Sequence, residues 1–145
     1  MWVQLIEKAW CKVCGSYEAS EMGTAMEAFN NIDGTPCQVF FTDTIERQNE
    51  QAILWDMLEE ADSQRYVVTV SIDSNERSNA DLIKEYGLCD FHSYTMMSCL
   101  AVKLWEKGRS YRYLIRLRNP WGKREWVGPW SDNSDTWQKY PDVGK

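Results

Sequence analysis

Apolar residues in the first fourteen positions recur with the period of an α-helix. They fall at i, i+3, i+4, i+7, i+8 and i+11, which is one stripe along a helix. The stripe consists of Trp2, Leu5, Ile6, Ala9, Trp10 and Val13. Gly15 follows at a place where glycine commonly caps a helix C-terminus. The pattern therefore predicts an N-terminal helix that ends at Gly15.

Two further segments have helical patterns. Thr24 and Glu27 have the spacing of a capping box and predict a short helix that begins at Thr24. Residues 44–61 predict a longer helix with one apolar face, formed by Leu54, Met57, Leu58 and Ala61. Residues 33–36 have the residues of a turn, and residues 73–81 predict a polar loop.

Strand-like segments dominate the rest of the chain. Residues 37–42 and 66–72 are rich in β-branched and aromatic residues. Two longer strands, over 92–105 and 110–118, are expected to pair around a turn at Lys107-Gly108. The last quarter predicts loop with short strands. Helices followed by antiparallel strands indicate an α+β fold, with antiparallel β-sheets flanked by helices.

Composition excludes several classes of protein. A length of 145 residues predicts one domain, and eight tryptophans with 43% hydrophobic residues exclude a disordered chain. No apolar run approaches the roughly 18 residues of a membrane span, and residues 1–8 do not resemble a signal peptide. Five cysteines without a signal peptide predict reduced thiols in an intracellular, cytoplasmic protein.

The net charge is −6, yet eight of the sixteen basic residues lie between 103 and 124. Such a cluster could bind a nucleic-acid backbone. However, Arg112, Arg116 and Arg118 alternate along a strand, as a solvated sheet face does, so no nucleic-acid partner is expected. Cys11 and Cys14 form a lone CxxC, and two small apolar residues on a helix explain it better than a metal site does.

The single histidine, His92, enters the first hairpin strand and shares the even-numbered face with Tyr94, Met96 and Leu100. A lone histidine there is either a hydrogen-bonded core residue or a general acid/base. Asn119 ends the odd-numbered, inward series of the second strand and needs hydrogen-bond partners. A plain hairpin places Asn119 nearer to Met96, so contact with His92 requires a bulge or a longer loop.

The block Arg116-Leu117-Arg118-Asn119-Pro120-Trp121-Gly122, followed by residues 125–132, resembles the signature around the active-site Asn of calpain-type cysteine proteases. Residues 5–10, 15–19, 71–73, 87–88 and 92–94 also resemble calpain segments in the family's order. The resemblance covers nearly the whole chain. It implies a fold similar to the second subdomain of a papain-like protease core.

The resemblance implies a general acid/base role for His92, an orienting role for Asn119 and a cleft-lining role for Trp121. The family's nucleophile lies in a preceding Gly-x-Cys-Trp segment, and no cysteine here has that context. Cys99, for example, has the opposite parity to His92. Residues 1–145 are therefore expected to be the His/Asn half of a protease core that is truncated at its C-terminus.

That half is expected to be inactive without its partner, the Cys-bearing half, and to act on protein substrates as a complete core. The resemblance also implies a calcium site, with Glu125 and Asp132 at two matching positions. Two solvated carboxylates explain them as well, and weak or no calcium binding is expected here. Phe91 stands where the family has Gly, which leaves open a calpain-like scaffold module that has lost catalysis.

Overall fold

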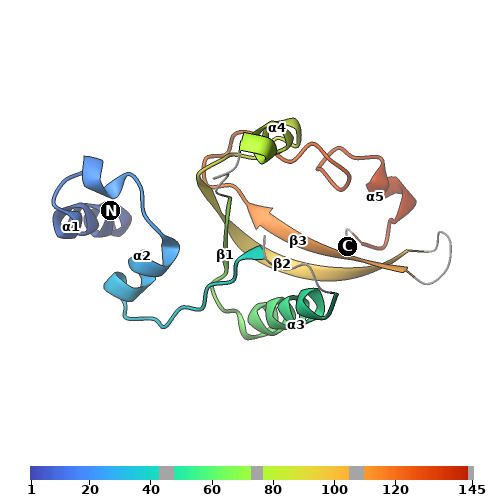
Figure 1. Cartoon of the computed structure of the whole chain (residues 1–145), viewed down its shortest axis with the longest axis horizontal. Helices are drawn as coiled ribbons and strands as arrows, with labels where there is room; N and C mark the ends of the chain where they lie inside the picture. The colour runs from blue at the N-terminus through green and yellow to red at the C-terminus, as the bar shows by residue number, and fades with distance from the viewer. Residues whose placement is uncertain (43–47, 73–76, 105–109, 144–145) are drawn as a thin grey trace. The chain divides into compact units, whose positions relative to one another are not determined.

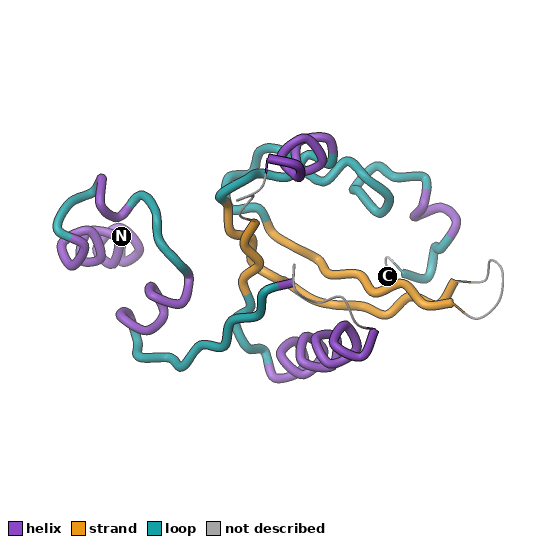
Figure 2. Tube along the Cα trace, viewed as in Figure 1, coloured by secondary structure: helices purple, strands orange, loops and turns teal. Residues whose placement is uncertain are grey.

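The structure is a computed structural model that describes residues 1–42, 48–72, 77–104 and 110–143. Its contacts divide the chain into two compact units, Met1–Ile45 and Glu46–Lys145, where length alone predicted one domain. The described residues form five α-helices, one 3-10 helix and a three-stranded antiparallel sheet (Figure 2). The predicted α+β class is confirmed.

The first unit begins with α1 (Trp2–Cys14), which ends at Gly15 with a φ of 97°. The 3-10 helix η1 (Glu18–Ser20) and α2 (Ala25–Ile32) follow. The predicted capping box is present, because the Glu27 amide donates to Thr24 Oγ1 at 3.2 Å and the Thr24 amide donates to Glu27 Oε2 at 3.2 Å. The sequence therefore predicted both helices of this unit and their caps.

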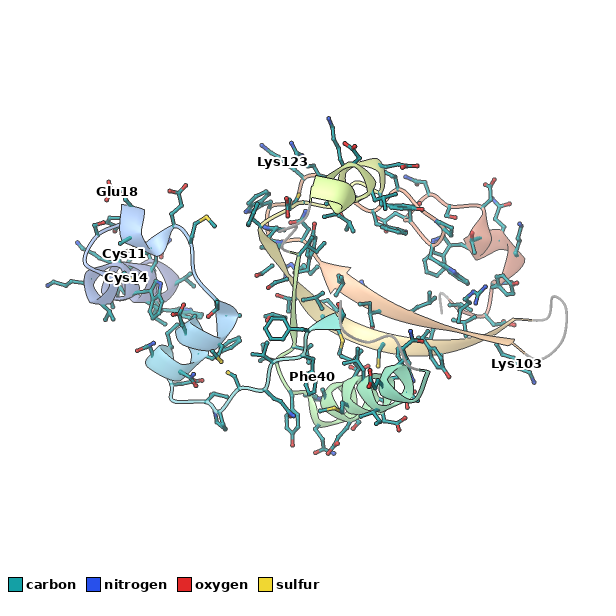
Figure 3. All side chains as sticks on the ribbon, viewed as in Figure 1. Cys11, Cys14, Glu18, Phe40, Lys103 and Lys123 are labelled. Atoms are coloured by element: carbon teal, nitrogen blue, oxygen red, sulfur yellow. The ribbon has the colours of Figure 1, made fainter. Side chains whose placement is uncertain are left out.

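The apolar stripe of α1 remains largely on the surface. Trp2, Leu5 and Val13 are 71%, 64% and 72% exposed, and Cys11 is the buried residue of the helix. The Cys11 thiol lies 3.0 Å from the Ser20 hydroxyl. Cys11 and Cys14 project from α1 as labelled in Figure 3, and both are free thiols. The stripe forms a helix but does not make a core among the described residues of this unit.

Residues 37–41 form an irregular segment, so the strand predicted over 37–42 is wrong. A strand needs a partner for its backbone groups, and the described residues of the first unit contain no second strand. The turn before it forms as predicted. The Thr35 amide donates to Asp33 Oδ1 at 3.0 Å, and Gly34 has a φ of 72°.

The second unit begins with α3 (Gln48–Gln64), which lies along one side of the hairpin in Figure 1. Trp55 is buried on α3, and its ring lies 4.6 Å from that of Tyr113. The predicted apolar face is half-buried at Leu54, Met57, Leu58 and Ala61. The helix extends three residues beyond the predicted end at Ala61, and residues 44–47 lie outside the described residues.

The sheet has the order β1-β2-β3, with β1 (Thr69–Ile72), β2 (His92–Leu104) and β3 (Ser110–Arg118) all antiparallel. The predicted strand over 66–72 is therefore shorter at its start. The predicted hairpin of two long strands is confirmed. Its turn at Lys107-Gly108 lies outside the described residues.

A bulge at Met97 changes the faces of the hairpin. Met96 pairs with Leu117, whereas Ser98 pairs with Arg116. Directly paired residues share a face, and neighbouring residues of β3 point to opposite faces. The even-numbered series that starts at His92 therefore stops at Met96, and Ser98, Leu100 and Val102 lie on the other face. The prediction that they share the face of His92 is wrong, because the bulge adds one residue to β2.

Residues 77–85 form the helix α4 (Arg77–Glu85), so the loop predicted over 73–81 is wrong there; residues 73–76 lie outside the described residues. The helix ends in two hydrogen bonds of a Schellman motif, from Leu88 N to Ile83 O at 2.9 Å and from Gly87 N to Lys84 O at 3.1 Å. Gly87 has a φ of 74°. The polar composition of residues 77–81 therefore predicted a loop where the chain forms a helix, and Gly87 ends that helix.

After β3 the chain continues as loop and turns with one short helix, α5 (Thr136–Lys139). The short strands predicted in this quarter are absent from residues 119–143. Trp130 instead packs against the rings of Trp137 and Tyr140, at 5.0 and 5.5 Å. Within the described residues, no helix has both the length and the apolar character needed to cross a membrane.

Candidate active site

His92 is the first residue of β2 and pairs with Ile72 of β1. Its side chain is only 7% exposed, and the Tyr94 ring stands nearly perpendicular to the imidazole, with the ring centres 4.8 Å apart. His92 is therefore a buried residue of the sheet. A buried polar ring needs a hydrogen-bond partner, and the partner is the residue that directly follows β3.

Asn119 follows the last residue of β3, and its Oδ1 lies 2.8 Å from Nε2 of His92. The register explains how the two meet. Arg118 pairs with Thr95, whereas a plain hairpin around Lys107-Gly108 would pair it with Met97. Part of this two-residue shift comes from the bulge at Met97. The contact between His92 and Asn119 is thus present, and the bulge that the sequence analysis required for it contributes to the register.

The turn after Asn119 holds its amide group. Pro120 has no N–H to continue the ladder, and Gly122 N donates to Asn119 O at 3.3 Å with a φ of 61° at Gly122. The chain therefore turns back, and Asn119 Nδ2 donates to two carbonyls, at 2.6 Å to Lys123 and 3.2 Å to Arg124. Lys123 is labelled in Figure 3.

These hydrogen bonds assign the protons around the ring. Both Nδ2 partners are carbonyl oxygens, which only accept, so the NH2 group must face them. Oδ1 then faces His92 and accepts, which requires a proton on Nε2. The imidazole is therefore held as the Nε2–H tautomer when neutral, and Nδ1 has a free lone pair. A free Nδ1 is the atom that a general base needs.

Trp121 completes the immediate surroundings of the pair. Its ring centre lies 4.0 Å from that of His92 with the planes tilted by 41°. Its backbone N–H donates to Asn119 Oδ1 at 3.0 Å, so this oxygen accepts twice. Trp121 is itself 59% exposed. The indole therefore shields the imidazole while it presents a large apolar surface outward.

Tyr94 and Cys89 form a buried contact beside His92, and the sequence pattern did not predict it as part of the site. Tyr94 Oη accepts from the Cys89 amide at 2.8 Å, and the two residues are 4% and 1% exposed. Burial raises the pKa of the Tyr94 hydroxyl, and the nearby Cys89 thiol adds to this effect. The sequence did contain a signal for this role of Tyr94, since it lies two residues after His92 and therefore on the same face of the strand.

Cys99 shares the face of His92, since it pairs with Ile115, so the predicted opposite face is wrong. It is nevertheless unsuited as a nucleophile for His92. Six to seven strand residues separate the two by roughly 20 Å. Burial and the Asp62 carboxylate raise the pKa of the Cys99 thiol, which disfavours the thiolate. Cys89 is enclosed, and Cys11, Cys14 and Cys37 belong to the first unit.

Glu125 and Asp132, the expected calcium ligands, are both exposed. The described residues contain no group of three or more His, Cys, Asp or Glu side chains that could hold a metal ion. Glu125 packs instead through its backbone, which lies against Gly87.

Comparison with known proteins shows the family of the chain. A family model described as calpain family cysteine protease matches residues 1–145. The chain is 37% identical to human Calpain-14 over 137 residues, 35% to the rat Calpain-1 catalytic subunit over 138, and 33% to Calpain clp-1 of Caenorhabditis elegans over 145. These matches cover 94%, 95% and 99% of the chain but 18%, 18% and 17% of the relatives.

The chain therefore spans about a fifth of the length of the curated relatives that it matches. The α+β fold with its antiparallel sheet is consistent with a calpain protease core. Family and fold thus agree with the resemblance carried by the block around Asn119. This chain belongs to the calpain family of cysteine proteases.

Proposed function

We propose that the chain supplies the general acid/base half of a calpain-type cysteine endopeptidase site, with His92 as acid/base and Asn119 as its orienting partner. The observation that carries the proposal is the fixed amide of Asn119. Its NH2 group is held by two backbone carbonyls, so its oxygen accepts from His92 Nε2. That arrangement leaves Nδ1 free to receive a proton.

In this mechanism Nδ1 of His92 takes the proton of a cysteine thiol supplied from outside this chain. The thiolate attacks the peptide carbonyl, and the imidazolium then carries protons on both nitrogens. Asn119 Oδ1 stabilises that cation through the Nε2–H hydrogen bond. Nδ1 next donates its proton to the leaving amine, and it later takes a proton from the water that hydrolyses the thioester.

Trp121 assists by its position rather than by proton transfer. Its ring lies against the imidazole, and its N–H donates to the same oxygen that His92 uses. Hydrogen bonds are stronger where water is excluded. Trp121 is therefore expected to hold the pair in one geometry and to form part of the substrate groove.

The proposal requires a partner, the Cys-bearing half of the protease core, and protein substrates. All five cysteines are free, which supports an intracellular, reducing location. If the complete protein depends on calcium, as the resemblance implies, its ligand set must extend beyond Glu125 and Asp132. We therefore expect weak or no calcium binding by this chain alone.

The experiment measures protein hydrolysis by the complete protein that contains this chain, as wild type and as His92→Ala, Asn119→Ala and Arg112→Ala. His92→Ala should lower kcat by at least about 10²-fold, since acid/base catalysis contributes roughly 10²–10⁴. Asn119→Ala should lower kcat less, and Arg112→Ala should leave it unchanged because Arg112 is an exposed residue of β3.

Full activity of His92→Ala would contradict the proposed role of His92. A wild-type protein that hydrolyses nothing, although its Cys-bearing half is present and folded, would support the alternative of a non-catalytic calpain-like scaffold.

A further inference from the structure

Phe91 has a backbone conformation that a phenylalanine rarely adopts. Its φ is 48°, in the left-handed region, where a bulky side chain is a conformational outlier. The Asp90 carboxylate supports this turn, since the Phe91 amide donates to Asp90 Oδ1 at 2.9 Å. Strained residues of this kind persist where the surroundings fix them, and they gather at functional sites.

The side chain of Phe91 is presented outward from a closely packed segment. Phe91 is 60% exposed, whereas Cys89, two residues before it, and His92, directly after it, are 1% and 7% exposed. Trp121, which contacts the imidazole from the other strand, is 59% exposed. Two large exposed aromatic residues are thus neighbours of His92: Trp121 through contact of its ring with the imidazole, and Phe91 as the preceding residue in the sequence.

The chemistry of the site tells which part of a substrate lies near these rings. His92 must donate its Nδ1 proton to the leaving amine, so the amine nitrogen must come within hydrogen-bond reach, about 3 Å. The residue that carries this amine follows the scissile bond. The side chain of that residue is attached to its Cα, which is bonded directly to the amine nitrogen. The side chain therefore lies close to the imidazole and to the residues around it.

We propose that Phe91 is a specificity-determining residue, whose exposed ring selects substrates with an apolar side chain immediately after the scissile bond. The inference rests on the proposed function. An aromatic ring that is more than half exposed gains free energy when an apolar side chain removes its surface from water. A charged side chain at that position would lose hydration without compensation.

The test uses the complete protein and two peptide series. One series varies only the residue after the scissile bond, between Leu and Asp, and the other varies only the residue before it. Phe91→Ala removes the ring and should reduce the Leu-over-Asp ratio of kcat/KM on the order of tenfold, since even one methylene in a hydrophobic pocket is worth about 10–200-fold. Phe91→Leu should retain most of the preference.

Phe91→Gly separates strain from the ring, because glycine adopts a φ of 48° freely. It should lose the preference as Phe91→Ala does while it raises Tm. Arg65→Gly is the matched control: Arg65 has a φ of 59° at the end of α3, so relief of strain there should raise Tm without changing any preference.

An unchanged Leu-over-Asp ratio in an active Phe91→Ala protein overturns the inference and leaves the proposed function intact. An equal change in both peptide series also overturns it, since that result indicates general disturbance of the site. A folded wild-type protein that cleaves no peptide overturns the proposed function and, with it, this inference.

Discussion

Asn119 makes hydrogen bonds through both ends of its amide, and this property decides what His92 can do. The sequence predicted that Asn119 faces inward at the end of a strand and needs partners. It could not predict that the carbonyls of Lys123 and Arg124 hold the NH2 group, since these oxygens reach it only because the chain reverses at Pro120 and Gly122. The sequence identified the side chain that needs hydrogen bonds, but it could not identify the backbone carbonyls that accept them.

At the same scale, Tyr94→Phe should destabilise the protein at neutral pH by about 1–2 kcal/mol, because it leaves the buried Cys89 amide without its acceptor. The difference in stability between the wild type and Tyr94→Phe should depend on pH. Burial raises the pKa of Tyr94 above its ordinary value of 10.0, so at alkaline pH the unfolded chain loses the Tyr94 proton while the folded chain retains it.

The Tyr94 contribution to stability is therefore fully present below about pH 10 and falls as the pH rises through the pKa of the folded state. Urea unfolding at neutral pH and above pH 10 measures this, and the gap between wild type and Tyr94→Phe should narrow at the higher pH. A constant gap would contradict the buried position of the hydroxyl.

At the scale of elements, the sequence predicted the first two helices and the hairpin strands correctly. The caps of α1 and α2 and the two strands of the hairpin depend on near neighbours in sequence. The strand expected at 37–42, the described part of the loop expected at 73–81 (residues 77–81) and the face of Cys99 were wrong, because each depends on distant residues. The first lacks a partner strand, α4 ends against Glu125–Val127, and the bulge shifts the register.

Gly87 fixes the end of α4 beside the segment that follows Asn119. A Cβ at Gly87 would overlap the Glu125 carbonyl, and its φ of 74° is unfavourable for alanine. We expect Gly87→Ala to lower the free energy of unfolding by about 3 kcal/mol or more. Gly122→Ala is the control, with a φ of 61° and open space around it, and should cost only about 1 kcal/mol.

Urea denaturation of the two variants tests this difference. Equal losses of unfolding free energy in the two variants would mean that the Glu125 carbonyl does not lie close enough to Gly87 to exclude a Cβ.

A second prediction at this scale concerns the contact between α3 and β2. The Cys99 amide donates to Asp62 Oδ2 at 3.0 Å, and the Asp62 charge is the second cause, after burial, of the raised thiol pKa. Asp62→Asn keeps an acceptor but removes the charge, so the pKa of Cys99 should fall and alkylation at mildly alkaline pH should become faster.

Mass spectrometry that resolves Cys99 from the other four cysteines measures this rate. Glu50→Gln, on the first turn of the same helix, should leave the rate unchanged. A slower or unchanged rate in Asp62→Asn would show that the carboxylate does not act on Cys99.

At the scale of the whole molecule, the chain is two compact units of unequal burial. The buried apolar residues of the second unit include Trp55, Tyr94, Met96 and Val102, whereas Cys11 is the buried residue among those described in the first. Sequence length alone could not reveal this division, since the apolar stripe of α1 resembles that of a core helix. Assignment of all 145 residues to the His/Asn half stays a prediction.

Unequal burial predicts unequal local stability. Amide hydrogens of α1 should exchange with solvent faster than those of β2 in the intact chain, by an amount that hydrogen-exchange mass spectrometry resolves readily. Similar protection of α1 and β2 would contradict the division into units of unequal stability.

The proposed role of His92 depends on which ring nitrogen carries the proton, and His92 is the only histidine of the chain. Nitrogen NMR of the histidine-labelled protein, at a pH where the ring is neutral, reports which nitrogen carries that proton. The prediction is a single Nε2–H tautomer in the wild type and a mixture of tautomers in Asn119→Ala. A proton on Nδ1 in the wild type would contradict the account, because the nitrogen meant to receive the thiol proton would already carry one.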